Sequence, residues 1–279
     1  MIFAWVACTA SVPDDAPPPL RFSAIPDHDT TLLKQRFDPF ARHLEAQLGV
    51  PVEYVPATDY LAAVEMFKNG DVQLAWFGGL TGVQARRAVP KARAIAQGVE
   101  DQAFRSHFIV HRSVDIEANE DFPAGLKGRT FTFGAPASTS GRLMPEHFIR
   151  EHTGLAPDAF FASPVGFSGA HDKTARLVAS GQVNAGVLNY QTWDALAAKG
   201  EVEGAKIVWT TPTYADYNFT AHPDLERYGD GFTARLQKVL TDLREPALLG
   251  ALSRSQLISA SNEDFAAIER VAMSLDMVR

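Results

Sequence analysis

Three consecutive hydroxyl side chains, Ser138, Thr139 and Ser140, are the residues of this sequence best suited to binding an anion. They follow a run of alternating β-branched and aromatic residues and a Gly-Ala-Pro turn, so a helix should begin at them. The first N–H groups of a helix have no partner inside it and carry the positive end of the helix dipole. With Gly141 allowing close approach of the backbone, hydroxyls and free N–H groups form a donor cup for an oxyanion.

The simpler interpretation of this cluster is an ordinary helix N-cap. Three hydroxyls followed by Gly, with no Glu or Gln at the third helical position, are more than a cap requires. Pro145 lies past the first turn of such a helix, and its nitrogen cannot donate a hydrogen bond to the carbonyl of Gly141. We therefore expect the opening turn to be offset from the rest of the helix.

Length and composition restrict the class of protein. The chain has 279 residues, which allows one large domain or two α/β lobes of ordinary size. A formal net charge of −7 without a Lys/Arg cluster argues against nucleic acid as a partner. The eight His residues are scattered, with no ligand-spaced pair beside Cys, Asp or Glu, so neither a metal nor a cofactor is expected.

The first nineteen residues are unlike the rest of the chain. An apolar run without Lys or Arg leads to Val6-Ala7-Cys8, which is similar to a bacterial lipoprotein processing site. The run is too short to span a membrane, and residues 9–19 are small, acidic and proline-rich, as in a tether. We expect residues 1–19 to be a truncated signal and tether, with lipid on Cys8 once an upstream signal is restored. The alternative is a disordered terminus with an accidental Cys.

Residues 20–111 alternate between strand and helix patterns, which predicts a mostly parallel sheet with helices on both faces. Ligands of such sheets bind beyond the carboxyl ends of the strands. Thr58 or Asp59 should cap one of the helices. The expected strands are 20–25, 52–55, 72–76, 92–97 and 107–111, and the segments at their ends that could reach a ligand are 26–31, 57–60 and 76–81.

A second α/β set runs from 112 to 212 and is long enough for a core of its own. It includes an expected short strand at 159–162, a glycine-containing loop at 166–170 and a helix that begins at His171. Residues 213–279 show a pattern of amphipathic helices that add no sheet lobe of their own, so we expect them to pack on the first lobe. The predicted domains are therefore 20–111 with 213–279, and 112–212, with crossings near 112 and 212.

Three motifs resemble one known family. They are the stretch from Leu126 to Gly141, the pentapeptide Gly-Ala-His-Asp-Lys at 169–173, and Gly-Gln-Val-Asn-Ala-Gly at 181–186. Together they are similar to the periplasmic phosphate/phosphite/phosphonate-binding proteins of ABC importers, over about residues 20–275. Segments 20–26 and 75–80 most resemble a branch of that family named for selenate binding.

This resemblance implies a fold and a role. The fold would be the type II periplasmic-binding-protein fold, in which two α/β lobes, with two mostly parallel sheets, are joined by two hinge strands. The role would be that of an extracytoplasmic solute-binding protein, which is not an enzyme. It would capture a small tetrahedral oxyanion between the lobes as a monomer and deliver it to an ABC permease in the inner membrane.

The resemblance also implies where the ligand binds. Ser138, Thr139 and Ser140 would hold the oxyanion, together with the N–H groups of Ser140 and Gly141, and His171 would reach it from the next helix start. The alternative for His171 is a ring that points to solvent. The first lobe would contribute Tyr60 and Trp76, although an aromatic residue at a strand end also suits a core. The remaining expected ligand-site residues, at the end of a second-lobe strand, are Asn189 and Gln191.

One departure from the family pattern limits the ligand. Members that bind aminoalkyl phosphonates have carboxylates near the strand end, where this chain reads Leu-Asn-Tyr-Gln at 188–191. A cation without a counter-charge would be held poorly there, so a compact anion is expected: phosphite, methylphosphonate, phosphate, sulfate or selenate. The roles of Asp27, His28, Asp29 and Asp59 stay open. A carboxylate in the cleft would have to accept a proton from the ligand, which favours protonated anions.

Two other functions compete with this one. A hydrolase triad of Ser138 or Ser140 with His171 and Asp172 is poorly arranged, because Asp172 directly follows the His that it would orient. The chain also has no Gly-x-Ser-x-Gly elbow. A sensor that presents its ligand to a histidine kinase would look the same in sequence.

Overall fold

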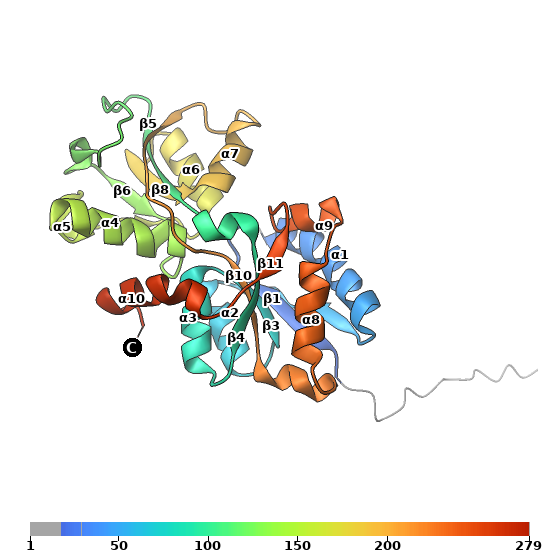
Figure 1. Cartoon of the computed structure of the whole chain (residues 1–279). Helices are drawn as coiled ribbons and strands as arrows, with labels where there is room; N and C mark the ends of the chain where they lie inside the picture. Colours follow the sequence, from blue (N-terminus) through green and yellow to red (C-terminus); the bar gives the residue numbers. More distant parts are fainter. Residues whose placement is uncertain (1–17, 29, 279) are drawn as a thin grey trace, which may run out of the picture.

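The computed structural model describes residues 18–28 and 30–278, which form two α/β lobes, and Figure 1 shows them one above the other. The expectation about Cys8 and most of the 1–19 tether lie outside the described residues. The first lobe is built on a six-stranded sheet in the order β11-β4-β10-β3-β1-β2. Its strands are β1 (Leu20–Ala24), β2 (Val52–Tyr54), β3 (Leu74–Phe77), β4 (Arg93–Gly98), β10 (Asn218–Ala221) and β11 (Leu257–Ser259).

Helices cover both faces of this sheet. On one side α1 (Thr30–Leu48) packs with α8 (Phe232–Thr241) and α9 (Pro246–Ala251). On the other, α2 (Tyr60–Lys68) and α3 (Gly79–Ala88) lie together, and α10 (Ala266–Ser274) packs against α3. The apolar stripe of α1 drives its packing, since each member lies at helical spacing and is buried: Leu33, Phe37, Phe40, Leu44 and Leu48.

The second lobe has a five-stranded sheet in the order β7-β6-β8-β5-β9. Its strands are β5 (Ser106–His111), β6 (Phe131–Phe133), β7 (Gly166–Phe167), β8 (Ala185–Asn189) and β9 (Ala205–Thr210). Its helices are α4 (Met144–Thr153), α5 (Pro157–Phe160), α6 (His171–Ala179) and α7 (Tyr190–Ala197). In Figure 1, α4 and α5 lie on one side of this sheet and α6 and α7 on the other.

Two expectations about elements were wrong, and a third was incomplete. The strand expected at 159–162 is instead the short helix α5 and the turn after it, because Pro157 fits the first turn of a helix. The strand β5 pairs with β8 and β9 of the second lobe, so the first crossing comes before Ser106 and not near residue 112. The segment after residue 212 contributes two strands, β10 and β11, to the first sheet.

Both sheets are mixed, and the connection between lobes explains why. The strands β1 to β4 run in one direction, while β10 is antiparallel to both of its neighbours, β3 and β4. In the second sheet β5 is antiparallel to β8 and β9. The carboxyl ends of the parallel strands face the cleft. A chain that crosses the cleft therefore enters the other sheet at that edge, and its first strand there runs antiparallel to the parallel strands of that sheet. The reversed strands β5 and β10 are each the first strand after a crossing, and β11, at the edge of the first sheet, is also antiparallel to its neighbour β4.

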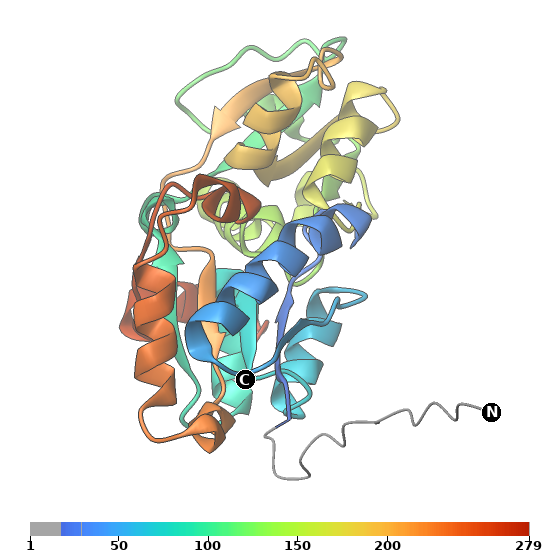
Figure 2. The same ribbon diagram turned by 90° about the vertical axis from the view of Figure 1, so that its right-hand side faces the viewer.

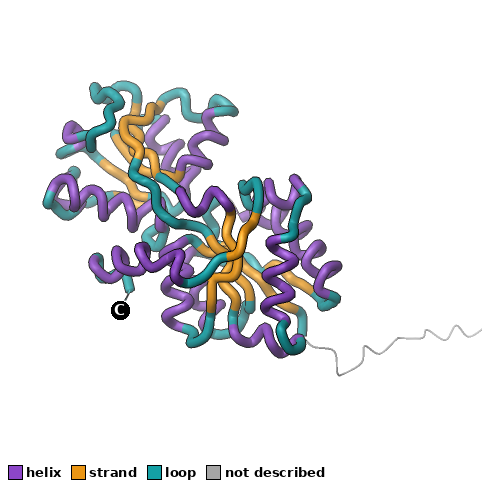
Figure 3. Tube along the Cα trace, in the orientation of Figure 1, coloured by secondary structure: helices purple, strands orange, loops and turns teal. Residues whose placement is uncertain are grey.

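The two crossings lie side by side, and Figures 2 and 3 show the chain passing twice between the lobes. Phe104 in the first crossing and Tyr214 in the second form an antiparallel bridge, with reciprocal backbone hydrogen bonds of 2.9 Å. The expected double connection between the lobes is therefore present, with Phe104 and Tyr214 paired in an isolated bridge and not in regular strands. No helix in the described part of the chain is long and apolar enough to span a membrane.

Candidate anion-binding site

The segment Ser138–Gly141 lies at the cleft edge of the second sheet and starts with an offset turn. Residues Thr139–Leu143 form a π-helical turn, η3, and the α-helix α4 begins only at Met144, with Pro145 in its first turn. This arrangement confirms the offset that Pro145 indicated. The Ser138 hydroxyl accepts a 2.9 Å hydrogen bond from the Gly141 N–H, and all four residues of the segment are buried.

The first lobe faces this segment with the N-terminus of α3. The N-cap residue of α3, Gly78, has no side chain, and two of the first N–H groups of the helix bond to side chains from elsewhere. The Gly79 N–H donates to Asp216 Oδ1 and the Leu80 N–H donates to Thr139 Oγ1, both at 2.9 Å. A Cβ atom on Gly78 would lie only 3.1 Å from Thr139 Oγ1, so the two lobes approach as closely as glycine allows. Two helical N-termini thus converge from opposite lobes.

His171 is the first residue of α6 and is 1% exposed. Its Nδ1 accepts a 3.3 Å hydrogen bond from the Asn189 N–H, which leaves the ring proton on Nε2. Burial lowers the pKa of His171 to about 4, although Asp27 opposes the shift. The ring is therefore a neutral Nε2–H donor at neutral pH, and that buried donor has no hydrogen-bond partner among the described residues.

The same geometry argues against a catalytic triad. The group that orients His171 is the backbone amide of Asn189, not a carboxylate. Asp172 pairs with Arg176 instead, at 2.8 Å. A triad needs an acid on the nitrogen that does not face the nucleophile, and here that nitrogen accepts a hydrogen bond.

Tyr60 enters the site from the first lobe as the first residue of α2, which Asp59 caps by accepting a 2.8 Å hydrogen bond from the Ala62 N–H. The Tyr60 hydroxyl lies beside Ser138, but within the described ranges it has no hydrogen bond of normal geometry. Burial, and to a lesser extent Asp27, raise the pKa of Tyr60 well above its usual value. The phenol therefore stays protonated and is a second unused donor.

The sequence did not single out Asp216, which the structure places in the same site. It is 1% exposed, beside the hydroxyls of Thr139 and Ser140, and its Oδ2 has no hydrogen-bond partner in residues 18–28 and 30–278. Burial raises the pKa of Asp216 to about 7, against the stabilising hydrogen bond from the Gly79 amide. Its position within the second crossing was the available signal, since a crossing segment must border the cleft.

The carboxylates that the sequence left open lie elsewhere. Asp27 accepts a 2.9 Å hydrogen bond from the Tyr217 hydroxyl, and Asp59 is the cap of α2. His28 borders two hollows next to the site, of about 50 and 570 Å³. Asp29 lies outside the described residues.

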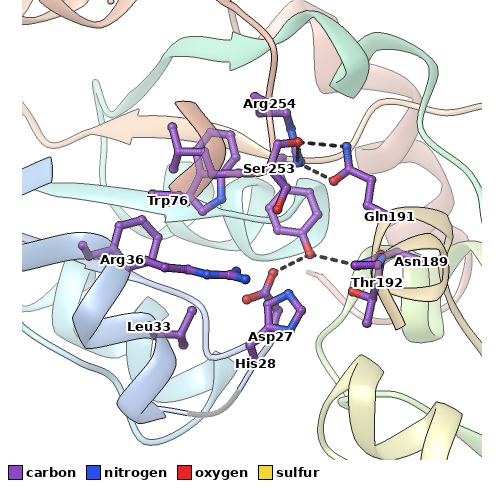
Figure 4. Close-up of a pocket in the computed structure, with 15 residues that line it drawn as sticks. Asp27, His28, Leu33, Arg36, Trp76, Asn189, Gln191, Thr192, Ser253 and Arg254 are labelled. Carbon is purple, nitrogen blue, oxygen red and sulfur yellow. Dashed lines mark hydrogen bonds between the residues drawn. The ribbon is translucent and has the colours of Figure 1, made fainter. Parts of the chain in front are cut away.

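The other three expected site residues border the smaller hollow, which Figure 4 shows. Trp76 is stacked on Tyr217, with ring centroids 5.6 Å apart. Asn189 caps α7, accepting a 2.7 Å hydrogen bond from the Thr192 N–H. Gln191 bonds to the first lobe, through Ser253 and Arg254. Among described residues, no group of three or more His, Cys, Asp or Glu side chains could hold a metal ion.

Comparisons with known proteins agree on the type of protein. A family model described as "ABC transporter, phosphonate, periplasmic substrate-binding protein" matches residues 22–265. A probable ABC transporter phosphite binding protein, PhnD1, of Prochlorococcus marinus (strain MIT 9301) is 38% identical over 94% of this chain and 92% of its own. The phosphate-import protein PhnD of Mycolicibacterium smegmatis (strain ATCC 700084 / mc(2)155) is 30% identical, over 75% of this chain and 68% of its own.

Solved structures agree with this assignment. The structure of Prochlorococcus marinus PhnD1 in complex with methylphosphonate has a TM-score of 0.88 and 38% sequence identity, covering 93% of this chain and 98% of that one. The similarity therefore extends over both lobes and both crossings. The chain belongs to the periplasmic phosphonate-type substrate-binding proteins of ABC transporters, which bind solutes for import and are not enzymes.

Proposed function

We propose that this protein captures a small tetrahedral oxyanion that keeps one proton, of the phosphite or methylphosphonate type, and delivers it to an ABC permease in the inner membrane. One observation carries the proposal. Three buried polar atoms without hydrogen-bond partners among the described residues surround the Ser138–Gly141 segment: Tyr60 Oη, His171 Nε2 and Asp216 Oδ2. Orphaned buried polar groups are costly, and a ligand that pairs with all three removes that cost.

The chemistry of these three atoms selects among anions. The protonated Tyr60 hydroxyl and the Nε2–H of His171 are both donors, so each suits an anionic oxygen. Asp216 lies in the same site, and as a carboxylate it accepts a proton from the ligand. A monoprotonated phosphite or phosphonate supplies that proton. Sulfate and selenate carry none at neutral pH, so only molecules in which Asp216 is itself protonated can bind them well.

The available donors suffice for useful affinity. A hydrogen bond to a charged group contributes roughly 1.5–3 kcal/mol. Four or five of them, less the cost of closing the lobes, support a micromolar complex at about −8 kcal/mol. Prochlorococcus marinus PhnD1, which is named for phosphite binding and whose structure was solved with methylphosphonate, supports the same class of ligand.

Calorimetric titration with phosphite, methylphosphonate, phosphate, sulfate and selenate, at about pH 6 and about pH 8.5, tests the proposal. Phosphite or methylphosphonate should bind tightest. Sulfate and selenate should lose affinity above the pKa of Asp216, with uptake of one proton on binding. Tight binding of selenate that does not depend on pH would contradict a site built for a protonated anion.

The location and the anchor are separate proposals. Relatives of this family are periplasmic, and we place this protein there as a monomer, held to the membrane through lipid on Cys8. Mass spectrometry of the protein expressed with an upstream signal should find a lipidated Cys8. A released, unmodified N-terminus would rule the anchor out.

A further inference from the structure

Gln191 connects the two lobes through hydrogen bonds made by both ends of its side-chain amide. It is the second residue of α7 in the second lobe. Its Nε2 donates to the Ser253 carbonyl of the first lobe at 3.2 Å, and its Oε1 accepts from Arg254 Nη1. Figure 4 shows Gln191 reaching these two residues, with Trp76 on the far side of Arg254.

Arg254 is held rigidly in the first lobe and does not depend on Gln191 for its position. Its Nε and Nη2 donate to the two oxygens of Asp101, each at 2.6 Å, and this ion pair is almost fully buried. Its guanidinium lies 4.8 Å from the ring centroid of Tyr217 and 5.4 Å from those of Trp76 and Phe104. The residue therefore presents Nη1 as a fixed donor toward the second lobe.

Asp101 ties this donor to the hinge. It lies in the 3₁₀ turn η1 (Val99–Ala103), directly before the first crossing, and it accepts from the Tyr217 N–H directly after the second crossing. Gly98 makes the necessary space, because a Cβ atom there would lie 2.3 Å from Arg254 Cδ. Both crossings thus converge on the residue that fixes Arg254.

We infer that Gln191 is a positioning residue, which sets how firmly the lobes stay closed and contributes to affinity without touching the ligand. When the lobes open, Arg254 keeps Asp101, its aromatic neighbours and the Leu252 carbonyl, and it loses only Gln191. The hydrogen bonds of Gln191 therefore favour the closed arrangement with and without ligand. Apparent affinity scales with the closed population, so every ligand gains by the same factor.

Two variants isolate this role. Gln191→Ala removes both hydrogen bonds between the lobes, together with one to the Tyr190 hydroxyl in its own lobe, and Gln191→Met does the same while filling most of the volume. Gln182→Ala is the matched control, an exposed glutamine of the same lobe. Both Gln191 variants should weaken phosphite and methylphosphonate by the same factor, about tenfold, mostly through faster dissociation in stopped-flow measurements. A changed ratio between the two ligands would instead mean that Gln191 touches them, and unchanged dissociation would mean that it holds nothing closed.

The affinity measurements rest on the proposed function, but closure can be tested without any ligand. Small-angle X-ray scattering of the unliganded protein should give a larger radius of gyration for both Gln191 variants than for the parent and for Gln182→Ala. Equal radii would overturn the inference even if phosphite binds. If no anion of the panel binds the parent while the radii differ as expected, the ligand assignment fails and the role of Gln191 stands.

Discussion

At the scale of single residues, the site depends on polar atoms whose protonation states are set by burial. His171 illustrates this, because an exposed histidine would carry a charge over part of the physiological pH range. Burial lowers its pKa to about 4, so it stays a neutral donor through an ordinary backbone hydrogen bond to Nδ1. The neutral ring avoids a buried charge in the absence of ligand and still offers one N–H to an anion.

We expect His171→Ala to weaken phosphite binding at least tenfold, about 1.4 kcal/mol, because one donor to the charged ligand is lost. Calorimetry at neutral pH measures the effect. His43→Ala, a partly exposed histidine on α1, should bind like the parent. Unchanged affinity in His171→Ala would place the anion elsewhere.

Asp216 should determine selectivity by accepting the proton of the ligand. In Asp216→Asn the amide can donate to an unprotonated oxygen, and the buried negative charge is gone. The preference for phosphite over sulfate should therefore fall at least tenfold near neutral pH, where phosphite is still partly protonated, and sulfate binding should no longer depend on pH. Competition titrations at several pH values measure both effects.

A charge-matched variant separates selectivity from general electrostatics. Asp59→Asn removes a negative charge directly before Tyr60 in the chain and keeps a side chain that caps α2 well. It should change the affinities for phosphite and sulfate in the same direction and by similar factors. If it shifts their ratio as strongly as Asp216→Asn does, Asp216 has no special role in selectivity.

At the scale of elements, the site forms where the N-terminus of α3 meets the turn η3. This contact needs Gly78, because a side chain there would press on Thr139 and Asp216, at 3.1 and 3.2 Å. We expect Gly78→Ala to hinder closure and lower affinity about tenfold or more, while thermal unfolding of the protein changes little. Calorimetry and differential scanning calorimetry of the same sample measure the two effects.

Gly250 supplies the control for an added methyl group. It lies inside α9, its φ is not positive, and a Cβ atom added to it would meet no other atom within 4 Å. Gly250→Ala should bind normally and gain about 0.5–1 kcal/mol of stability, since alanine favours the helix. Equal losses of affinity in Gly78→Ala and Gly250→Ala would show that the loss at Gly78 does not come from hindered closure of the lobes.

Local sequence signals predicted most elements of this fold, and failed where distant pairing decides the structure. The stripe of α1, the cap at Asp59 and the offset start of α4 each follow from spacing or from a residue type with one strong preference. The short strands β10 and β11 have no such signal, because they are defined by pairing with β3 and β4. The same limit applies to the site, since Asp216 lies directly before β10.

At the scale of the whole molecule, the proposed site brings together residues from five separate stretches of the chain, around Tyr60, Gly78, Ser138, His171 and Asp216. The sequence could identify Ser138 and His171 through motifs in one lobe. It could not assign Gln191, because its neutral side chain fits a ligand contact and a contact between lobes equally well. Only the packing of α7 against the loop after α9 distinguishes the two.

A buried carboxylate kept for binding should also cost stability, and this cost has a definite pH dependence. The pKa of Asp216 is about 7 in the folded protein, above its ordinary value of 3.8. Between these values the folded state holds a proton that the unfolded state releases. Stability contributed by the protonated carboxyl is therefore complete below pH 3.8 and is lost as pH rises to about 7, by about 4 kcal/mol in all.

Asp216→Asn should remove this dependence, because the amide resembles the protonated carboxyl at every pH. Compared with the parent, the variant should gain several kcal/mol of unfolding free energy at about pH 8 and almost none at about pH 4. Urea unfolding across that range measures the difference, in which the titration of all other groups cancels. An equal effect at both pH values would mean that Asp216 ionises normally in the fold. In that case the ionised Asp216 carboxylate does not destabilise the folded protein, and a proton on the ligand gains nothing by pairing with it. The selectivity expected for phosphite would then lose its physical basis.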